Sequence, residues 1–167
     1  MALPAQKLRE IVLQLLYSED IANQDDNIIQ MLMQELAISK KHVKSAFDRV
    51  SSIKQKFDQI DPMITAASVS YDFNRIQLVT KNILRLALYE IFFDTEIPDK
   101  VAISEAIRLS RKFATPESAK FVNALLDYLY KKKIGEAPLN EDFSHQAESL
   151  LAEEPIPPTI LQPDVTE

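Results

Sequence analysis

Residues 74–93, which read NRIQLVTKNILRLALYEIFF, decide the fold of this chain. If the segment is helical, apolar side chains cover nearly its whole circumference. They are Ile76, Val79, Ile83, Leu84, Leu86, Leu88, Tyr89, Ile91, Phe92 and Phe93. A helix that is apolar on all sides is buried among other elements, because no face of it suits contact with water. The segment is therefore predicted to be the central helix of the domain.

The sequence on both sides of this segment has the period of amphipathic helices and shows no clear strand alternation. Capping signals mark several helix starts, at Pro4, Ser39, Asp61-Pro62 and Thr115-Pro116. We expect helices after Pro4, at 28–36, from Ser39 to Ile60, after Pro62, at 101–113 and from Pro116 to about Lys133. The predicted fold class is all-α, with about seven helices.

The single glycine, Gly135, and the absence of cysteine exclude several functions. Phosphate-binding loops, dinucleotide fingerprints and nucleophile elbows each need glycines at fixed positions. A chain without cysteine has no thiolate nucleophile, disulfide or iron–sulfur ligand, and no structural zinc of the usual kind. Asp142 and His145 have metal-ligand spacing, but one such pair does not make a site. The sequence therefore predicts no enzyme activity, no cofactor, no metal and no small-molecule substrate.

The charge is divided unevenly between two parts of the 167 residues. All nineteen Lys and Arg residues lie in the first 135 residues, beside seventeen acids, so residues 1–135 carry +2. Residues 136–167 hold eight acids, no Lys or Arg and five of the nine prolines. We interpret 1–135 as the folded domain, ended by Gly135, and 136–167 as an acidic, proline-rich tail that is partly helical or disordered. Such asymmetry often marks a nucleic-acid-binding body, although a tail can also be a solvated segment without a role.

No part of the sequence predicts a membrane or export segment. A membrane helix needs roughly 20 apolar residues, and no stretch approaches that length. The apolar run at residues 11–17 is too short for a signal peptide and has glutamates on both flanks. A cytoplasmic protein is therefore expected.

Four blocks of sequence, in order, resemble the bacterial NusB family of transcription antitermination factors. They are KLREIVLQLLYS at 7–18, NILRLALYEI at 82–91, PDKVAISEAI at 98–107 and KFVNALLD at 120–127, with Phe113 and Ser118 between the last two. The resemblance implies a fold of two small helical bundles packed together. It also implies pairing with ribosomal protein NusE, binding of the single-stranded boxA element of nascent ribosomal RNA, and an indirect place in the RNA polymerase antitermination complex. The family has no catalysis and no cofactor.

The resemblance also assigns site residues. Those expected to contact RNA are Lys7, Arg9, Glu117, Ser118, Lys120 and Phe121, although Ala5 and Gln6 stand where the family usually has basic residues. Those expected to contact NusE are Thr80, Lys81, Arg85 and Tyr89. Two roles stay open. Phe121 either stacks on an RNA base or belongs to the core. Arg85 either contacts the partner or, as we favour, forms an internal bridge, with Glu90 and Glu105 as candidate acids.

Two other functions remain open at this point. The chain could be a stand-alone relative of the NusB-like RNA-binding module of ribosomal RNA cytosine methyltransferases, or a helical protein-binding adaptor with little RNA affinity. The sequence does not indicate whether the chain is a monomer or a homodimer. The acidic tail suggests a further hypothesis, because a tethered acidic segment can compete with RNA phosphate for a basic surface.

Overall fold

The computed structural model describes residues 3–21, 30, 33–34, 38–68 and 72–136, and every regular element in these ranges is helical. The α-helices are α1 (Ala5–Ile21), α3 (Lys40–Lys54), α4 (Phe57–Ala67), α5 (Leu78–Phe93), α6 (Asp99–Phe113) and α7 (Pro116–Lys133). A short 3-10 helix, η1 (Phe73–Arg75), precedes α5. The all-α prediction is confirmed. The predicted helix at 28–36 has its apolar positions Ile28, Leu32 and Leu36 outside the described residues, as does the tail at 137–167.

Helix α5 is the centre of the molecule, as its composition predicts. An unbroken run of its residues from Asn82 to Leu88 is buried, and so are Thr80, Glu90 and Ile91. The helix packs against α1, α3, α4, α6 and α7, and its partly exposed residues lie towards its two ends. It begins at Leu78, later than the start of the apolar segment, because η1 occupies the preceding residues.

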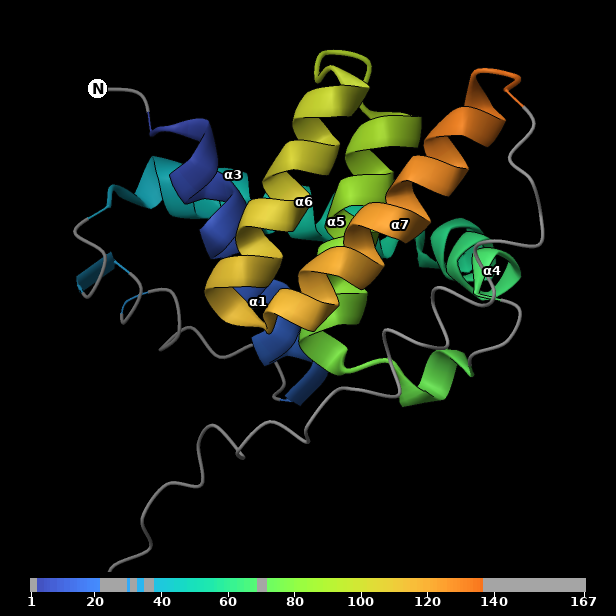
Figure 1. Cartoon of the computed structure of the whole chain (residues 1–167). Coiled ribbons are helices and arrows are strands. Elements are labelled where there is room, and N and C mark those ends of the chain that lie inside the picture. Colours follow the sequence, from blue (N-terminus) through green and yellow to red (C-terminus); the bar gives the residue numbers. More distant parts are fainter. Residues whose placement is uncertain (1–2, 22–29, 31–32, 35–37, 69–71, 137–167) are drawn as a thin grey trace, which may run out of the picture.

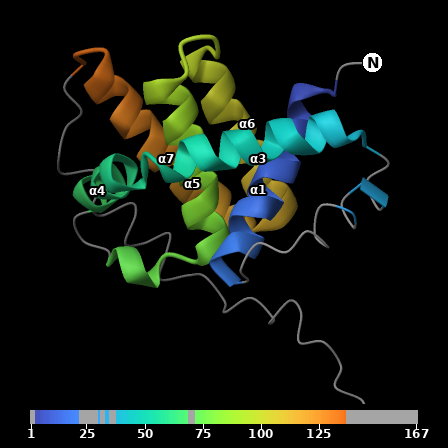
Figure 2. The ribbon, with the colours of Figure 1, turned by 180° about the vertical axis from the view of Figure 1, so that it is seen from behind.

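Two groups of helices share α5. On one side α1, α3 and α5 pack together, and on the other α4, α6 and α7 pack with α5. Figure 1 shows α5, α6 and α7 side by side, and Figure 2 shows α3 running across α1 and α5 on the opposite face. This arrangement agrees with the expected pair of small helical bundles. Among the described residues, no helix is long and apolar enough to cross a membrane.

The predicted helix ends are confirmed at three places. Ser39 caps α3 by accepting from the His42 amide, and Thr115 caps α7, which begins with Pro116. Gly135 has a φ of 80°, and the amide of the following residue donates to the Lys131 carbonyl over 2.9 Å. This left-handed turn closes the C-terminus of α7 in the way that glycine favours.

The predicted boundary between α3 and α4 is wrong. One helix was expected from Ser39 to Ile60, followed by a new helix after Asp61-Pro62. Instead α3 ends at Lys54, α4 begins at Phe57, and Pro62 lies inside α4. The reason is packing, because the buried side chains of α3 face α1 and α5 whereas those of α4 face α5 and α7. One straight helix cannot reach both groups of neighbours.

Candidate functional site

Arg9 lies in the N-terminal half of α1 and is engaged within the protein. Its side chain is 10% exposed, and its Nε donates to Glu90 Oε1 of α5 over 2.9 Å. Its Nη1 lies 3.8 Å from Glu105 Oε2 of α6. The guanidinium that was expected to meet RNA backbone therefore connects α1 to the shared helix α5 and to α6 of the opposite group.

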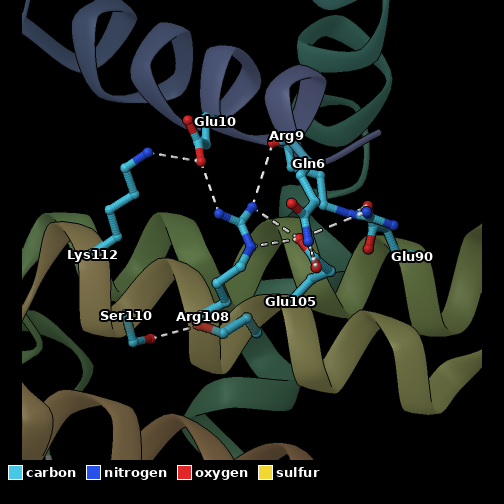
Figure 3. A network of polar contacts seen from close by, with 9 residues as sticks. Gln6, Arg9, Glu10, Glu90, Glu105, Arg108, Ser110 and Lys112 are labelled. Atoms are coloured by element: carbon cyan, nitrogen blue, oxygen red, sulfur yellow. Dashed lines mark hydrogen bonds and ion pairs between the residues drawn. The ribbon is translucent and has the colours of Figure 1, made fainter. Parts of the chain in front are cut away.

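Glu10, the next residue of α1, binds two cations of α6 (Figure 3). Its Oε1 accepts from Arg108 Nη1 over 2.7 Å and from Lys112 Nζ over 3.0 Å. Arg108 also donates to Glu105 Oε2 through Nε and Nη2, over 3.0 and 2.9 Å. Together with Arg9 and Glu90, this network contains three cations and three carboxylates, so its formal charges cancel.

The pKa values of two carboxylates in the network are shifted in opposite directions. Burial raises the pKa of Glu90, and the pairing with Arg9 only partly offsets it. Burial also acts to raise the pKa of Glu10, but the hydrogen bonds from Arg108 and Lys112 outweigh it and hold that pKa below its ordinary value. Glu10 is therefore a stable anion at neutral pH, fixed between its two partners.

The first two turns of α7 hold four of the residues expected to contact RNA. The Ser118 amide donates to Thr115 Oγ1 over 3.1 Å, and the Ser118 side chain is buried in the same cap. Phe121 is 0% exposed and belongs to the hydrophobic core. This burial favours the core role that the sequence left open, because an enclosed ring has no face for a base. Glu117 is half-buried and Lys120 is exposed.

Several cations on the segments around this network are not buried, and we call four of them the basic surface: Lys7, Arg111, Lys112 and Lys120. Lys112 is itself paired with Glu10 in the network, whereas the other three lie outside it. Lys112 reaches from the last turn of α6 to α1, which brings these two helices into direct contact. The two residues Ala114 and Thr115 then lead into α7, so Lys120 follows within two turns. The sequence did not assign Arg111 and Lys112 to the site, because their proximity to α1 depends on the packing of α6.

Arg85 forms the internal bridge that the sequence favoured, but with an unexpected acid. Its Nε and Nη2 donate to the two carboxylate oxygens of Asp61 in α4, both over 2.8 Å. Glu90 and Glu105, the expected partners, pair with Arg9 instead. The misplaced start of α4 explains the error, because Asp61 was interpreted as a helix cap rather than as an inward-facing side chain.

The other predicted partner residues of α5 lie among aromatic rings and cations. We call six residues the cation–aromatic face: Arg49, Lys56, Phe73, Lys81, Tyr89 and Phe93. The Lys81 Nζ lies 4.4 Å from the Phe73 ring centroid, and the Arg49 Cζ lies 5.4 Å from that of Tyr89. The Lys56 Nζ lies 5.0 Å from the Phe93 centroid. Cations over aromatic faces attract the rings and hold both groups in place.

Thr80 is a predicted partner residue that is 3% exposed. Among the described residues, its Oγ1 is the buried side-chain atom without a hydrogen-bond partner. Lys81 and Tyr89 are half-buried, so they are the two predicted partner residues with substantial surface. Thr80 and Arg85 are buried.

A model of a known protein family matches most of the chain. A model of the NusB family matches residues 6–131, from the first turn of α1 to the last turn of α7. The chain belongs to the NusB family. The matched range includes both the basic surface and the cation–aromatic face.

Individual NusB proteins are similar over most of their length. The transcription antitermination protein NusB of Chlamydia pneumoniae is 39% identical over 140 residues, which are 83% of this chain and 85% of that protein. A solved structure of T. maritima NusB is 32% identical, with a TM-score of 0.67 over 83% of this chain and 96% of that one. A structure of the antitermination factors NusB and NusE in complex with dsRNA has 23% identity and a TM-score of 0.64, over 76% and 96% of the chains. This last likeness concerns the NusB fold alone.

Proposed function

We propose that this chain is a transcription antitermination factor that binds boxA-type single-stranded RNA of nascent ribosomal RNA transcripts together with ribosomal protein NusE. The observation that carries the proposal is the match to the NusB family over residues 6–131. The family relationship covers all the helices that form the two surfaces, rather than one motif. Through the RNA and NusE, the chain takes part in the antitermination complex of RNA polymerase.

The basic surface is the part of the chain that meets RNA in this proposal. Phosphate contacts from Lys and Arg supply most of the affinity for a nucleic acid, and they need exposed cations. Lys7, Arg111, Lys112 and Lys120 meet that need, since none of them is buried. Arg9, Ser118 and Phe121 are buried, and they stabilise the packing of the helices that carry these cations. Glu117 borders the surface as a half-buried carboxylate.

The cation–aromatic face is the part that pairs with NusE. Lys81 and Tyr89 supply the accessible contacts, and Arg85 fixes the face through its pair with Asp61. Thr80 is buried with an unpaired hydroxyl, so pairing with NusE gives that hydroxyl a partner only if α5 shifts locally. Arg49 of this face is paired with Asp94 over 2.7 Å, and Lys56 and Lys81 supply the remaining positive charge, which suits a partner segment that presents acidic side chains.

The direct test of the proposed function is a titration of fluorescently labelled boxA RNA with the chain, with and without NusE. Binding that becomes at least about tenfold tighter with NusE, and that a scrambled RNA of equal length does not reproduce, supports the proposal. Ten-fold corresponds to roughly 1.4 kcal/mol of coupling between the two partners. Weak binding that is independent of sequence and unchanged by NusE overturns it.

The proposed role requires no catalysis. The chain acts through two binding surfaces, so we infer that it is not an enzyme and needs no cofactor. Its RNA target emerges from RNA polymerase during synthesis, which places the chain in the cytoplasm.

A second candidate function is a protein-binding adaptor with little RNA affinity. The specific observation in its favour is the burial of Arg9, Ser118 and Phe121, which removes three of the six residues expected to contact RNA. The same titration separates the two candidates. An adaptor binds NusE but does not retain boxA RNA in either arm of the experiment.

A further inference from the structure

The chain carries an acidic segment beyond the part that the NusB family model matches. Residues 137–167 contain seven Asp and Glu residues and no Lys or Arg. The family match ends at residue 131, so this segment lies outside the matched helices. Its chemistry is that of a polyanion, which is the same chemistry that a basic RNA-binding surface recognises in a phosphate backbone.

The basic surface carries unpaired positive charge that such a segment can bind. Within the described part of the chain, Lys7, Arg111 and Lys120 have no ion-pair partner, whereas Arg9 and Arg108 are neutralised in the network with α1, α5 and α6. With Glu117 counted against the three unpaired cations, an excess of two positive charges remains outside the network. This excess is available to an anion without breaking any ion pair in the fold.

The acidic segment is long enough to reach the basic surface from the end of α7. Helix α7 has 18 residues, so its two ends are about 27 Å apart at 1.5 Å per residue. The acidic segment starts just after the Gly135 turn, at the far end of α7 from Lys120. An extended chain covers about 3.3 Å per residue, so even ten residues span the length of α7. The remaining residues can reach Arg111 and Lys7.

We propose that the acidic segment 137–167 occupies the basic surface in the RNA-free chain and competes there with RNA phosphate. The competition rests on the proposed RNA-binding function, whereas the contact itself does not. Tethering gives the segment an effective concentration in the millimolar range, which compensates for weak individual ion pairs. The contact is electrostatic and exposed to solvent, so salt weakens it.

The contact can be measured without RNA, because the chain has no natural cysteine. Ser149→Cys in the full chain gives a single site for a paramagnetic spin label. At 50 mM salt, the label is expected to broaden the amide signals around Lys7, Arg111 and Lys120. Signals around Lys40 and Lys41, exposed lysines of α3, serve as the internal control. The broadening should disappear at 500 mM salt, where the screening length falls below about 5 Å.

A matched pair of full-length variants tests whether charge is the cause. The neutral tail carries E141Q, D142N, E148Q, E153Q, E154Q, D164N and E167Q, which remove all seven carboxylates of the segment. The control tail carries seven uncharged changes: N140A, S144A, Q146A, T159A, Q162A, V165A and T166A. The neutral tail is expected to abolish the broadening, and the control tail to preserve it. Unchanged broadening in the neutral tail, or no broadening in the original chain, overturns the contact.

Titration with boxA RNA then tests the competition. The neutral tail is expected to bind RNA about three- to tenfold more tightly than the control tail at 50 mM salt, with the difference falling towards onefold at 500 mM. RNA should also reverse the broadening in the original chain. Equal affinity of the two variants at low salt overturns the competition. Absence of RNA binding by either variant, with NusE present, overturns the proposed function instead, while the spin-label result decides the contact by itself.

Discussion

Arg85 shows how a single residue links the centre of the molecule to a candidate interface. Its guanidinium binds Asp61 with two parallel hydrogen bonds and lies 4.1 Å from the Phe57 ring centroid. Its third donor reaches Asn82 Oδ1 over 3.1 Å. A planar guanidinium can satisfy all these contacts at once, which a lysine ammonium cannot.

Arg85→Ala is expected to lower the free energy of unfolding by about 3 kcal/mol, because it leaves Asp61 without its partner and removes a buried side chain. Arg75→Ala, a change at an exposed arginine of η1, is the matched control and is expected to change stability by less than about 0.5 kcal/mol. Urea unfolding followed by circular dichroism measures both. Equal stability of the two variants would contradict an internal role for Arg85.

The sequence predicted that Arg85 is bridged internally because an arginine on a helix that is apolar all round needs a buried partner. It could not identify that partner. Asp61 is 24 residues away, and its orientation depends on where α4 begins. Arg9 and Phe121, which the resemblance placed among the RNA contacts, are buried, and the sequence could not show this for a related reason. Each lies on a helix with both polar and apolar neighbours, and only the packing of α1 and α7 decides which of them faces inward.

At the scale of elements, the ionic network attaches α1 to the opposite helical group. Glu10 is the carboxylate that α1 contributes to this network, and its partners are Arg108 and Lys112. The pKa of Glu10 is lower in the folded chain than its ordinary value of 4.5. The stabilisation from this residue is therefore complete above that value and is lost as the pH falls through the folded pKa.

Glu10→Gln is expected to lower the free energy of unfolding by about 2 kcal/mol at pH 7, because it removes two charge-assisted hydrogen bonds. The difference from the original chain should shrink as the pH falls below 4.5 and through the lowered pKa of Glu10 in the folded chain. Thermal melts between pH 3 and 7 measure it, with Glu96→Gln at an exposed glutamate as the control. A difference that is independent of pH would show that the charge of Glu10 is not the cause.

The turn after α7 gives a prediction about backbone conformation. Gly135 has a φ of 80°, and an added Cβ would meet no atom within 4 Å. Gly135→Ala is therefore expected to cost about 1 kcal/mol through strain in the backbone and not through a clash. Gly135→Asn should cost less, since asparagine tolerates the left-handed region. Chemical denaturation compares the two variants, and identical stabilities would argue against a left-handed turn in solution.

Element positions were predicted with different success along the chain. The caps Ser39 and Thr115 and the turn at Gly135 were found because each has a local chemical signal. The break between α3 and α4 was missed, because the apolar stripe from Val43 to Ile60 continues through it without any glycine or proline. The break arises from the different neighbours of the two helices, which the local sequence does not encode.

At the scale of the whole molecule, the central claim is that exposed cations on α1, α6 and α7 form one RNA-binding surface. These cations come from segments that are about 100 residues apart in the chain, and the contact of Lys112 with Glu10 brings the segments together. The sequence indicated Lys7 and Lys120 separately, whereas Arg111 and Lys112 joined the surface only once the packing of α6 on α1 was known.

The most direct test compares two triple variants in the boxA titration with NusE present. K7Q/R111Q/K120Q removes three cations of the basic surface, and K40Q/K41Q/K44Q removes three exposed cations from the first turns of α3, so both lose the same charge. We predict that the first variant binds RNA at least about tenfold more weakly and has a log–log salt slope shallower by about 2, because three phosphate contacts to a single strand are lost. The second should bind within about twofold of the original chain. Equal losses in the two variants would contradict a defined surface on α1, α6 and α7.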